Sequence, residues 1–193
     1  MNKLTLALDI GNVCIEINHK NVFRKMGISE VPEGFFELLE NFECGRIEES
    51  EFFERFRDFA GKNFSVDFLK EAFNSILIAP VSGMAELVSA MKKSGVKPVF
   101  FSDISTTHLQ RTRELFPAEN CVPHGVYSFV CGARKPSIQM LSEFEKNFGV
   151  PDLYVDDRIE LIEAAREYGW HAIQFNGASH LEEELKKLLD ETE

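Results

Sequence analysis

The distribution of apolar and polar residues along the chain predicts a buried sheet. Four short apolar runs each end abruptly at a polar residue. Residues 4–8 are followed by Asp9, residues 96–101 by Ser102, residues 153–155 by Asp156, and residues 172–175 by Asn176. Continuous apolar runs of this length are typical of strands that are covered on both faces.

The segments between these runs have helical spacing and matching end signals. Ser82 precedes an amphipathic segment that stops at Gly95, and Ser105 or Thr106 can cap a segment that runs to Phe116. Pro136 opens a helix to about Phe148, residues 159–168 form a helix before Gly169, and residues 181–193 form a charged surface helix. Such caps and stops mark helix ends. The alternation predicts an α/β fold, a Rossmann-like doubly wound parallel sheet with helices on both faces.

One stretch, from about Cys14 to Pro80, breaks this alternation. It has no clear strand pattern, but residues 34–39, 48–59 and 66–78 have amphipathic helical spacing. We predict a small all-helical cap over residues 14–80, inserted after strand one, and a core formed by residues 1–13 and 81–193. Ten of the 18 phenylalanines fall between Phe35 and Phe73. An amphipathic apolar face is normally buried, so these rings are expected to form the cap's own core, although some could roof a substrate pocket.

Charge and composition narrow the choice of partner. Hydrophobic residues make up 44% of the chain and charged residues 27%, as in ordinary globular proteins, and the net charge is -11. So acidic a chain, without a basic cluster, repels nucleic-acid phosphates and anionic membranes. We therefore expect a small or metal-complexed substrate as the partner, with no nucleic acid and no membrane, and leave open whether the protein is a monomer or a dimer.

The cysteines and the first residues indicate a cytoplasmic protein. Cys14, Cys44, Cys121 and Cys131 form no CxxC pair and have no accompanying histidine cluster. This pattern argues against a structural zinc site and favours reduced, partly buried thiols. The apolar run at the N-terminus is short and contains Asp9, so it resembles neither a signal peptide nor a membrane span.

Polar side chains at the ends of the predicted strands indicate a binding site. Ligands of open parallel sheets bind outside the carboxyl ends of the strands, where Asp9, Ser102, Asp156 and Asp157 are expected. Lys135 lies in a loop just before a helix. Clustered carboxylates repel one another unless a cation joins them, and such hard oxygen ligands suit Mg²⁺. Asp9 in particular is too costly to bury without a partner.

Some of these residues also have simpler interpretations. Ser102 or Asp157 could instead have no role other than capping the helix that follows it. Arg134 and Lys135 could be an exposed, solvated basic pair.

Four segments, in order, resemble the motifs of the haloacid dehalogenase-like (HAD) superfamily. They are Asp9-Ile10-Gly11-Asn12-Val13, Phe100-Phe101-Ser102-Asp103, Arg134-Lys135-Pro136 and Val155-Asp156-Asp157. The insert after the first motif resembles the helical C1 cap of subfamily IA, and the resemblance covers nearly the whole chain. The Asp-x-Gly-Asn-Val stretch is similar to a subgroup that includes sugar 1-phosphate phosphatases.

The resemblance implies a magnesium-dependent phosphatase whose partner is a small phosphorylated metabolite. Asp9 would attack phosphorus and form an aspartyl phosphate, and Ser102, Lys135 and Asp156 would complete the catalytic set. Ser102, Lys135 and backbone groups at Ile10, Gly11 and Asp103 would bind the phosphoryl oxygens. Asp9, the Gly11 carbonyl and Asp156 would hold Mg²⁺, while Asp157 would bind the metal directly, through water, or orient a neighbour.

Two positions depart from the usual pattern of the superfamily. Gly11 stands where its phosphatases usually carry a second Asp, which protonates the leaving oxygen. An anomeric oxygen needs less proton help, so Gly11 favours a sugar 1-phosphate or a similarly activated ester. Asp103 stands where related sequences often have Asn. Its charge near a phosphate needs compensation, by Arg134 or by ordered water, unless it is a surface residue.

Two other functions remain open. A 2-haloacid dehalogenase also uses an attacking Asp and needs no acid, but Gly11 and the Asp156-Asp157 pair argue against it. A non-catalytic binding protein would explain Gly11 and Asp103, but not the intact Asp9 and Lys135. In the cap, residues 43–46 form a polar turn. Arg46 could reach a substrate if Gly45 lets this turn approach, although a solvated connecting loop is the ordinary expectation.

Overall fold

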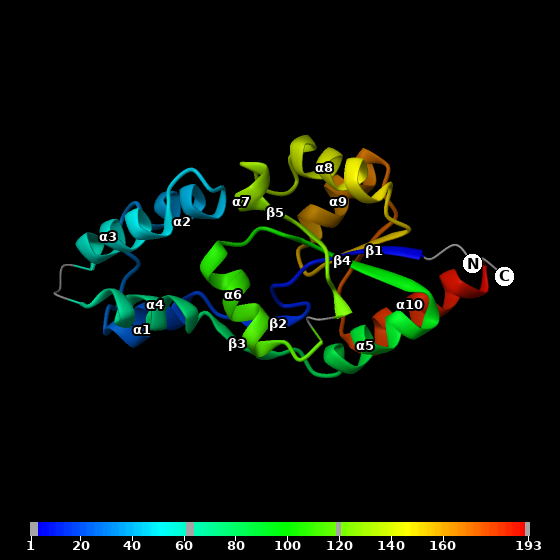
Figure 1. The fold of residues 1–193 in the computed structure, drawn as a ribbon, viewed down its shortest axis with the longest axis horizontal. Coiled ribbons are helices and arrows are strands. Elements are labelled where there is room, and N and C mark those ends of the chain that lie inside the picture. The colour runs from blue at the N-terminus through cyan, green and yellow to red at the C-terminus, as the bar shows by residue number, and fades with distance from the viewer. Residues whose placement is uncertain (1–3, 61–63, 119–120, 192–193) are drawn as a thin grey trace.

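The computed structural model describes residues 4–60, 64–118 and 121–191, and its centre is a five-stranded sheet (Figure 1). The strands are β1 (Leu4–Leu8), β4 (Val96–Ser102), β5 (Gly125–Tyr127), β6 (Leu153–Asp156) and β7 (Ala172–Gln174). They are all parallel, in the order β5-β4-β1-β6-β7. The predicted α/β parallel sheet is confirmed. β5 was not predicted, because three residues beginning with glycine give no apolar run.

Helices cover both faces of this sheet, as a doubly wound fold requires (Figure 1). α5 (Met84–Ser94), α6 (Thr106–Leu115) and α10 (Ala178–Asp190) pack on the face that holds Leu6 and Leu8 of β1. α8 (Ile138–Phe148) and α9 (Ile159–Tyr168) pack on the opposite face with Ala7, and the short α7 (Ser128–Cys131) precedes α8. Both faces of β1 are therefore buried, which explains its unbroken apolar sequence. Within the described ranges, no helix is both long enough and apolar enough to cross a membrane.

The helix ends follow the predicted capping signals with small shifts. The Ser105 hydroxyl accepts a hydrogen bond from the backbone of His108 at the start of α6. Ser137 caps α8 in the same way, so this helix begins at Ile138 and not at Pro136 as predicted. The last helix begins at Ala178, three residues before the predicted start.

In its described residues, the segment between β1 and α5 contains four helices and two short strands. The helices are α1 (Lys20–Met26), α2 (Phe35–Glu43), α3 (Glu49–Phe59) and α4 (Val66–Asn74). The strands β2 (Ile15–Ile17) and β3 (Leu77–Pro80) pair antiparallel and join these helices to the sheet. The prediction of an all-helical segment without strands is therefore wrong at its two ends. Strands of three and four residues are too short to show alternation, so residues 77 and 78 were assigned to a helix.

The helices α1 to α4, called the cap below, have a hydrophobic core of their own beside the sheet (Figure 1). Phe42 and Phe52 stack with ring centroids 4.4 Å apart, and Phe73 lies 4.9 Å from Phe52. The prediction that most of the phenylalanines form such a core is confirmed. Phe36 and Phe59 are exceptions, with 61% and 37% of their surfaces exposed.

The contacts between the cap and the sheet domain include two hydrogen bonds and a ring stack. The Ser128 hydroxyl donates to the backbone carbonyl of Glu43 at 2.5 Å, and the Thr107 hydroxyl donates to the Glu49 carboxylate at 2.6 Å. In the ring stack, the ring centroids of His108 in α6 and Phe73 in α4 lie 3.9 Å apart. The cap is thus seated on the carboxyl-end side of the sheet, where the candidate site lies.

Candidate active site

The centre of the sheet brings three polar residues to one edge. β1 lies between β4 and β6, and Leu8 is in register with Phe100 on one side and Val155 on the other. Asp9, Ser102 and Asp156 therefore follow at neighbouring strand ends, where all three are buried. Their convergence was expected from the sequence, because parallel strands present their carboxyl ends at the same edge.

Lys135 joins two of these strand ends. Its ammonium group lies 2.7 Å from Oδ1 of Asp9 and 2.6 Å from Oδ2 of Asp156, and it also donates to the Phe101 carbonyl at 3.0 Å. Only 4% of its side chain is exposed, so the interpretation of Lys135 as part of a solvated basic pair is wrong. The loop between α7 and α8 carries Lys135 to this place from far along the sequence.

Burial and charge set the protonation of this group. Burial alone would lower the pKa of Lys135, but the charges of Asp9 and Asp156 raise it well above its usual value. Burial would also raise the pKa of Asp156, yet Lys135 and a hydrogen bond from Tyr154 hold it below the ordinary value. Burial raises the pKa of Asp9 and the charge of Lys135 lowers it; the effect of burial is the larger, so the pKa of Asp9 is raised. The arrangement thus keeps a permanent positive charge beside Asp9.

Asp157 adds a third carboxylate at the edge of the site. Asp9, Asp156 and Asp157 each offer one oxygen, and these oxygens lie within 4.8 Å of one another. Asn12 fixes Asp157 by donating to its Oδ2 at 2.9 Å, while Oδ1 of Asn12 accepts from the backbone of Ile17 at 3.1 Å. Three carboxylates against one ammonium leave an excess of negative charge, which suits a divalent cation with hard oxygen ligands.

Asp103 is compensated by a neighbouring cation. Its Oδ1 accepts from the backbone of Lys135 at 2.9 Å, and its Oδ2 lies 3.5 Å from Nε of Arg134. Arg134 also reaches the cap, where its Nη2 lies 3.5 Å from Oε2 of Glu43. Among the possibilities that the sequence left open, pairing with Arg134 therefore describes Asp103, and its side chain is not a surface group.

The backbone after β1 makes a tight turn. The Ile10 carbonyl accepts from the backbones of Cys14 and Ile15, at 2.8 and 2.9 Å, and the Ile10 side chain is buried in the core. Gly11 has no side chain to contribute, and a Cβ at this position would lie 3.1 Å from Cδ1 of Ile17. The Ile17 side chain therefore fills the space next to Gly11.

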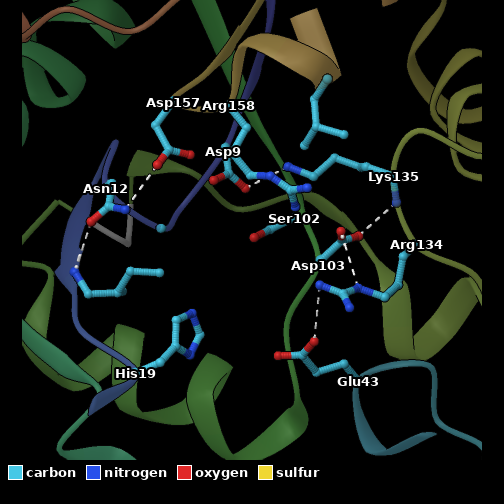
Figure 2. A pocket seen from close by; sticks show the side chains of 13 residues that line it. Asp9, Asn12, His19, Glu43, Ser102, Asp103, Arg134, Lys135, Asp157 and Arg158 are labelled. Atoms are coloured by element: carbon cyan, nitrogen blue, oxygen red, sulfur yellow. Dashed lines mark hydrogen bonds and ion pairs between the residues drawn. The ribbon is translucent and has the colours of Figure 1, made fainter. Parts of the chain in front are cut away.

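These residues surround a cavity of about 370 Å³ between the sheet and the cap (Figure 2). Of the predicted residues, those at its wall are Asp9, Gly11, Ser102, Asp103, Lys135 and Asp157. Asp156 is fully buried behind Lys135 and is not at the wall.

Further lining residues lie outside the predicted catalytic, phosphate-binding and metal-binding sets, namely Asn12, His19, Glu43 and Arg158. Figure 2 shows His19 and Glu43 across the pocket from Asp9 and Asp157. No local pattern marks these two residues, because only the docking of the cap brings them to the site.

A second cavity, of about 610 Å³, continues outward beneath α2 and shares His19, Glu43 and Arg134 with the first. Arg46 lines this outer cavity and is paired with Glu40 at 3.2 Å. The prediction of a polar turn over residues 43–46 is wrong at its start, because Glu43 is the last residue of α2. The turn is also no purely solvated connection, since Gly45 packs directly against the backbone carbonyl of Phe129.

Comparison with solved structures identifies the fold. A HAD family enzyme from Bacteroides thetaiotaomicron, solved with magnesium and inorganic phosphate, is 20% identical with a TM-score of 0.80, over 93% of this chain and 98% of that one. A predicted HAD-like family hydrolase from Porphyromonas gingivalis is 19% identical with a TM-score of 0.80, over 98% of both chains.

A more distant match is L-2-haloacid dehalogenase from Xanthobacter autotrophicus with covalently bound chloropropionic acid. It is 14% identical with a TM-score of 0.58, over 89% of this chain and 76% of that one. Neither a protein-family model nor a curated protein matches the sequence. At these identities the likeness shows the fold, which is that of HAD family enzymes.

Proposed function

We propose that the protein is a magnesium-dependent hydrolase of the HAD superfamily, which cleaves a small phosphate monoester through an aspartyl phosphate on Asp9. The observation that carries this proposal is the convergence of the Asp9, Asp156 and Asp157 carboxylates, whose oxygens lie within 4.8 Å of one another, beside the buried ammonium of Lys135 and next to a cavity. Such a set of groups provides a nucleophile, a fixed positive charge and a place for a divalent cation.

Each residue has a defined part in the proposed reaction. A carboxylate oxygen of Asp9 attacks phosphorus, and the bond from phosphorus to the leaving oxygen breaks. Lys135, held 2.7 Å from Asp9, orients this nucleophile and neutralises charge on the transferring group. The Ser102 hydroxyl and backbone groups near Gly11 and Asp103 hold the phosphoryl oxygens.

The acidic cluster fits magnesium in charge and in ligand type. Asp9, Asp156 and Asp157, with the Gly11 carbonyl, are the residues that would hold the ion. When bound, Mg²⁺ would supply electrostatic stabilisation of the phosphoryl group. The hydrogen bond from Asn12 positions Asp157 for this role.

Gly11 points to the class of ester. A side chain that could protonate the leaving oxygen is absent at this position, and Ile17 fills the adjacent space. Position 11 itself gives the leaving oxygen no proton, so any donor must lie farther away, and we infer a sugar 1-phosphate or a similarly activated ester, whose leaving oxygen needs less protonation than that of an ordinary alkyl ester. The inference predicts faster hydrolysis of glucose 1-phosphate than of glucose 6-phosphate, and equal rates for the two esters would refute it.

Release of inorganic phosphate from p-nitrophenyl phosphate tests the activity itself. We expect turnover with Mg²⁺, none after chelation of the metal, and none in Asp9→Asn with Mg²⁺ present. Wild type and Asp9→Asn that are equally inert across a panel of phosphorylated metabolites would instead indicate a binding protein. Release of chloride from 2-chloropropionate without Mg²⁺ would indicate a dehalogenase.

A further inference from the structure

The proposed reaction lacks a group that protonates the leaving oxygen. Position 11 offers no side chain, and the space beside it is occupied by Ile17. The leaving group must extend from Asp9 into the cavity, toward the cap. There, the wall opposite Asp9 carries two groups that can transfer a proton, Glu43 and His19 (Figure 2).

We propose that Glu43 of the cap is the catalytic acid and base of this site, in place of the side chain that Gly11 lacks. The proposal rests on the phosphatase function inferred above. Glu43 lines both the inner cavity with Asp9 and the outer cavity beneath α2. Its carboxyl group therefore stands where a leaving group bound between Asp9 and the cap would pass.

The placement of Glu43 disfavours its charged form. It is the last residue of α2, where the negative end of the helix dipole repels a carboxylate. Only 7% of the residue is exposed. An ionised carboxyl at such a place destabilises the fold unless it is well paired, so its presence calls for a functional reason.

Its partners hold the group without neutralising it fully. Within the described chain, the carboxyl group has one ion pair, to Arg134 at 3.5 Å, and no hydrogen bond. The other charged groups that face it are Asp103 and Glu40, with His19 across the same cavity. Burial raises the pKa of Glu43 to about 7, with Asp103 and Glu40 adding to the effect and Arg134 opposing it. A carboxyl group near this pKa can both give and accept a proton at neutral pH.

The backbone around Glu43 fixes its position relative to the sheet domain. The Ser128 hydroxyl donates to the Glu43 carbonyl at 2.5 Å and accepts from the backbone of Ile104 at 2.9 Å. Two residues later, Gly45 packs on the Phe129 carbonyl. The end of α2 is thus anchored at the site, although it belongs to the cap.

The other cavity groups are poorer proton donors. His19 has its pKa lowered by burial and by Arg134, so it is neutral at neutral pH. Lys135 is held charged between two carboxylates, and the pKa of a guanidinium such as Arg134 is too high for proton release. Of the four groups on the cap-facing side of the cavity or beside it, namely His19, Arg134, Lys135 and Glu43, Glu43 has the pKa best suited to give and regain a proton at neutral pH.

Glu43 gives up a proton in the first step of the reaction and regains one in the second. As Asp9 bonds to phosphorus, the bond to the leaving oxygen breaks, and the Glu43 carboxyl proton moves to that oxygen to give the free alcohol. The Glu43 carboxylate then takes a proton from water, whose oxygen attacks the phosphorus of the aspartyl phosphate. The bond from phosphorus to Asp9 breaks, inorganic phosphate leaves, and both carboxyl groups return to their initial states.

A series of phosphate esters with leaving groups of increasing pKa tests this role. For Glu43→Gln we expect kcat/KM to fall by about 10² to 10⁴ for alkyl phosphates, and by only a few-fold for 2,4-dinitrophenyl phosphate. A plot of log kcat/KM against leaving-group pKa therefore becomes steeper than that of the wild type. A purely structural role would lower all esters by the same factor and leave the slope unchanged.

The matched control is Glu51→Gln, which removes the charge of another cap glutamate in an exposed pair with Arg55. It should keep the slope of the wild type. Parallel plots for wild type and Glu43→Gln overturn the proposal, as does a steeper plot for His19→Gln alone. If the wild type lacks Asp9-dependent release of phosphate from 2,4-dinitrophenyl phosphate, the phosphatase function fails as well, so the two failures are distinguishable.

Discussion

Lys135 is the single residue on which the geometry of the site depends most. Its ammonium group is shared between Asp9 and Asp156. In the pair with Asp156, 4% of the Lys135 side chain and 0% of the Asp156 side chain are exposed. Breaking a buried ion pair by removing one partner leaves an uncompensated charge, which is more damaging than losing an exposed pair. Here two carboxylates would be left facing each other.

Lys135→Met is therefore expected to destabilise the protein by about 3–5 kcal/mol. Added Mg²⁺ should restore more stability to this variant than it adds to the wild type, because the ion takes over part of the lost positive charge. Urea unfolding with and without Mg²⁺ measures both effects. Lys146→Met, whose side chain is 73% exposed, is the matched control. Equal stability of Lys135→Met and wild type without Mg²⁺ would contradict the account.

Residues such as Asp9, Ser102 and Lys135 could be identified from the sequence, because strand ends and motif order mark them. Glu43 and Arg134 could not be assigned as partners, since they are distant in sequence and meet only when α2 docks on the loop after α7. The role of Asn12 in holding Asp157 could likewise not be inferred from the sequence. Its φ of 52° and its bond to Asp157 depend on the turn that follows β1.

At the scale of elements, the contact between α2 and α7 decides where the cap lies. Gly45 has a φ of 63°, and any Cβ there would collide with the Phe129 carbonyl. Both the left-handed backbone and the close approach require glycine. The close approach of Gly45 to the Phe129 carbonyl thus limits how closely the end of α2 can approach α7.

Gly45→Ala should lower kcat/KM for phosphate esters, because α2 and Glu43 must shift away from the cavity. Gly95→Ala has the same backbone strain at φ 85°, but no atom lies within 4 Å of the added Cβ. It should cost about 1 kcal/mol in stability and leave kcat/KM unchanged. Steady-state kinetics and thermal unfolding of the two variants separate the effects, and equal losses of activity in both would count against a positioning role for this contact.

The contact between α4 and α6 should make stability depend on pH. His108 is stacked on Phe73, its Nε2 lies 3.1 Å from the Phe73 carbonyl, and burial lowers its pKa to about 4. The folded state thus prefers the neutral ring. The stabilisation is complete above the unfolded pKa of about 6.5 and is lost as pH falls toward 4, by about 3 kcal/mol in total.

His108→Phe keeps the ring stack and removes this titration. Urea unfolding at several pH values should show that the wild type loses stability between pH 6.5 and 4 by about 3 kcal/mol more than the variant does. Parallel pH dependences of the two proteins would show that His108 is not the group responsible.

The elements themselves were predictable to different degrees. Long apolar runs and capped helices gave β1, β4, α5 and α9 nearly at their observed bounds, because burial on both faces and helix caps leave local signals. β2, β3 and β5 have three or four residues each, and their pairing depends on strands distant in sequence. β6 and β7 are equally short, but each belongs to an apolar run that ends at a polar residue. By contrast, β2 has Glu16 at its centre, β3 ends at Pro80 and β5 begins with Gly125, so these three lack that signal.

At the scale of the whole molecule, the described residues form three hydrophobic cores around one polar site. The cap has its phenylalanine-rich core, and the sheet has cores on its two faces. The clustered carboxylates come from the strand ends of the sheet domain and Lys135 from its loop between α7 and α8, whereas Glu43 comes from the cap and His19 from the residue before α1. The site is therefore complete only in the docked arrangement, and its chemistry depends on both units.

In the proposed reaction, Asp9 is the nucleophile whose carboxylate oxygen bonds to phosphorus. The most direct measurement is mass spectrometry of peptides after acid quenching of the enzyme during turnover of a phosphate monoester with Mg²⁺. We predict one added phosphoryl group on the peptide that contains Asp9, and none in Asp9→Asn or without Mg²⁺. Turnover with no such adduct, or with the phosphoryl group on another residue, would contradict the central claim.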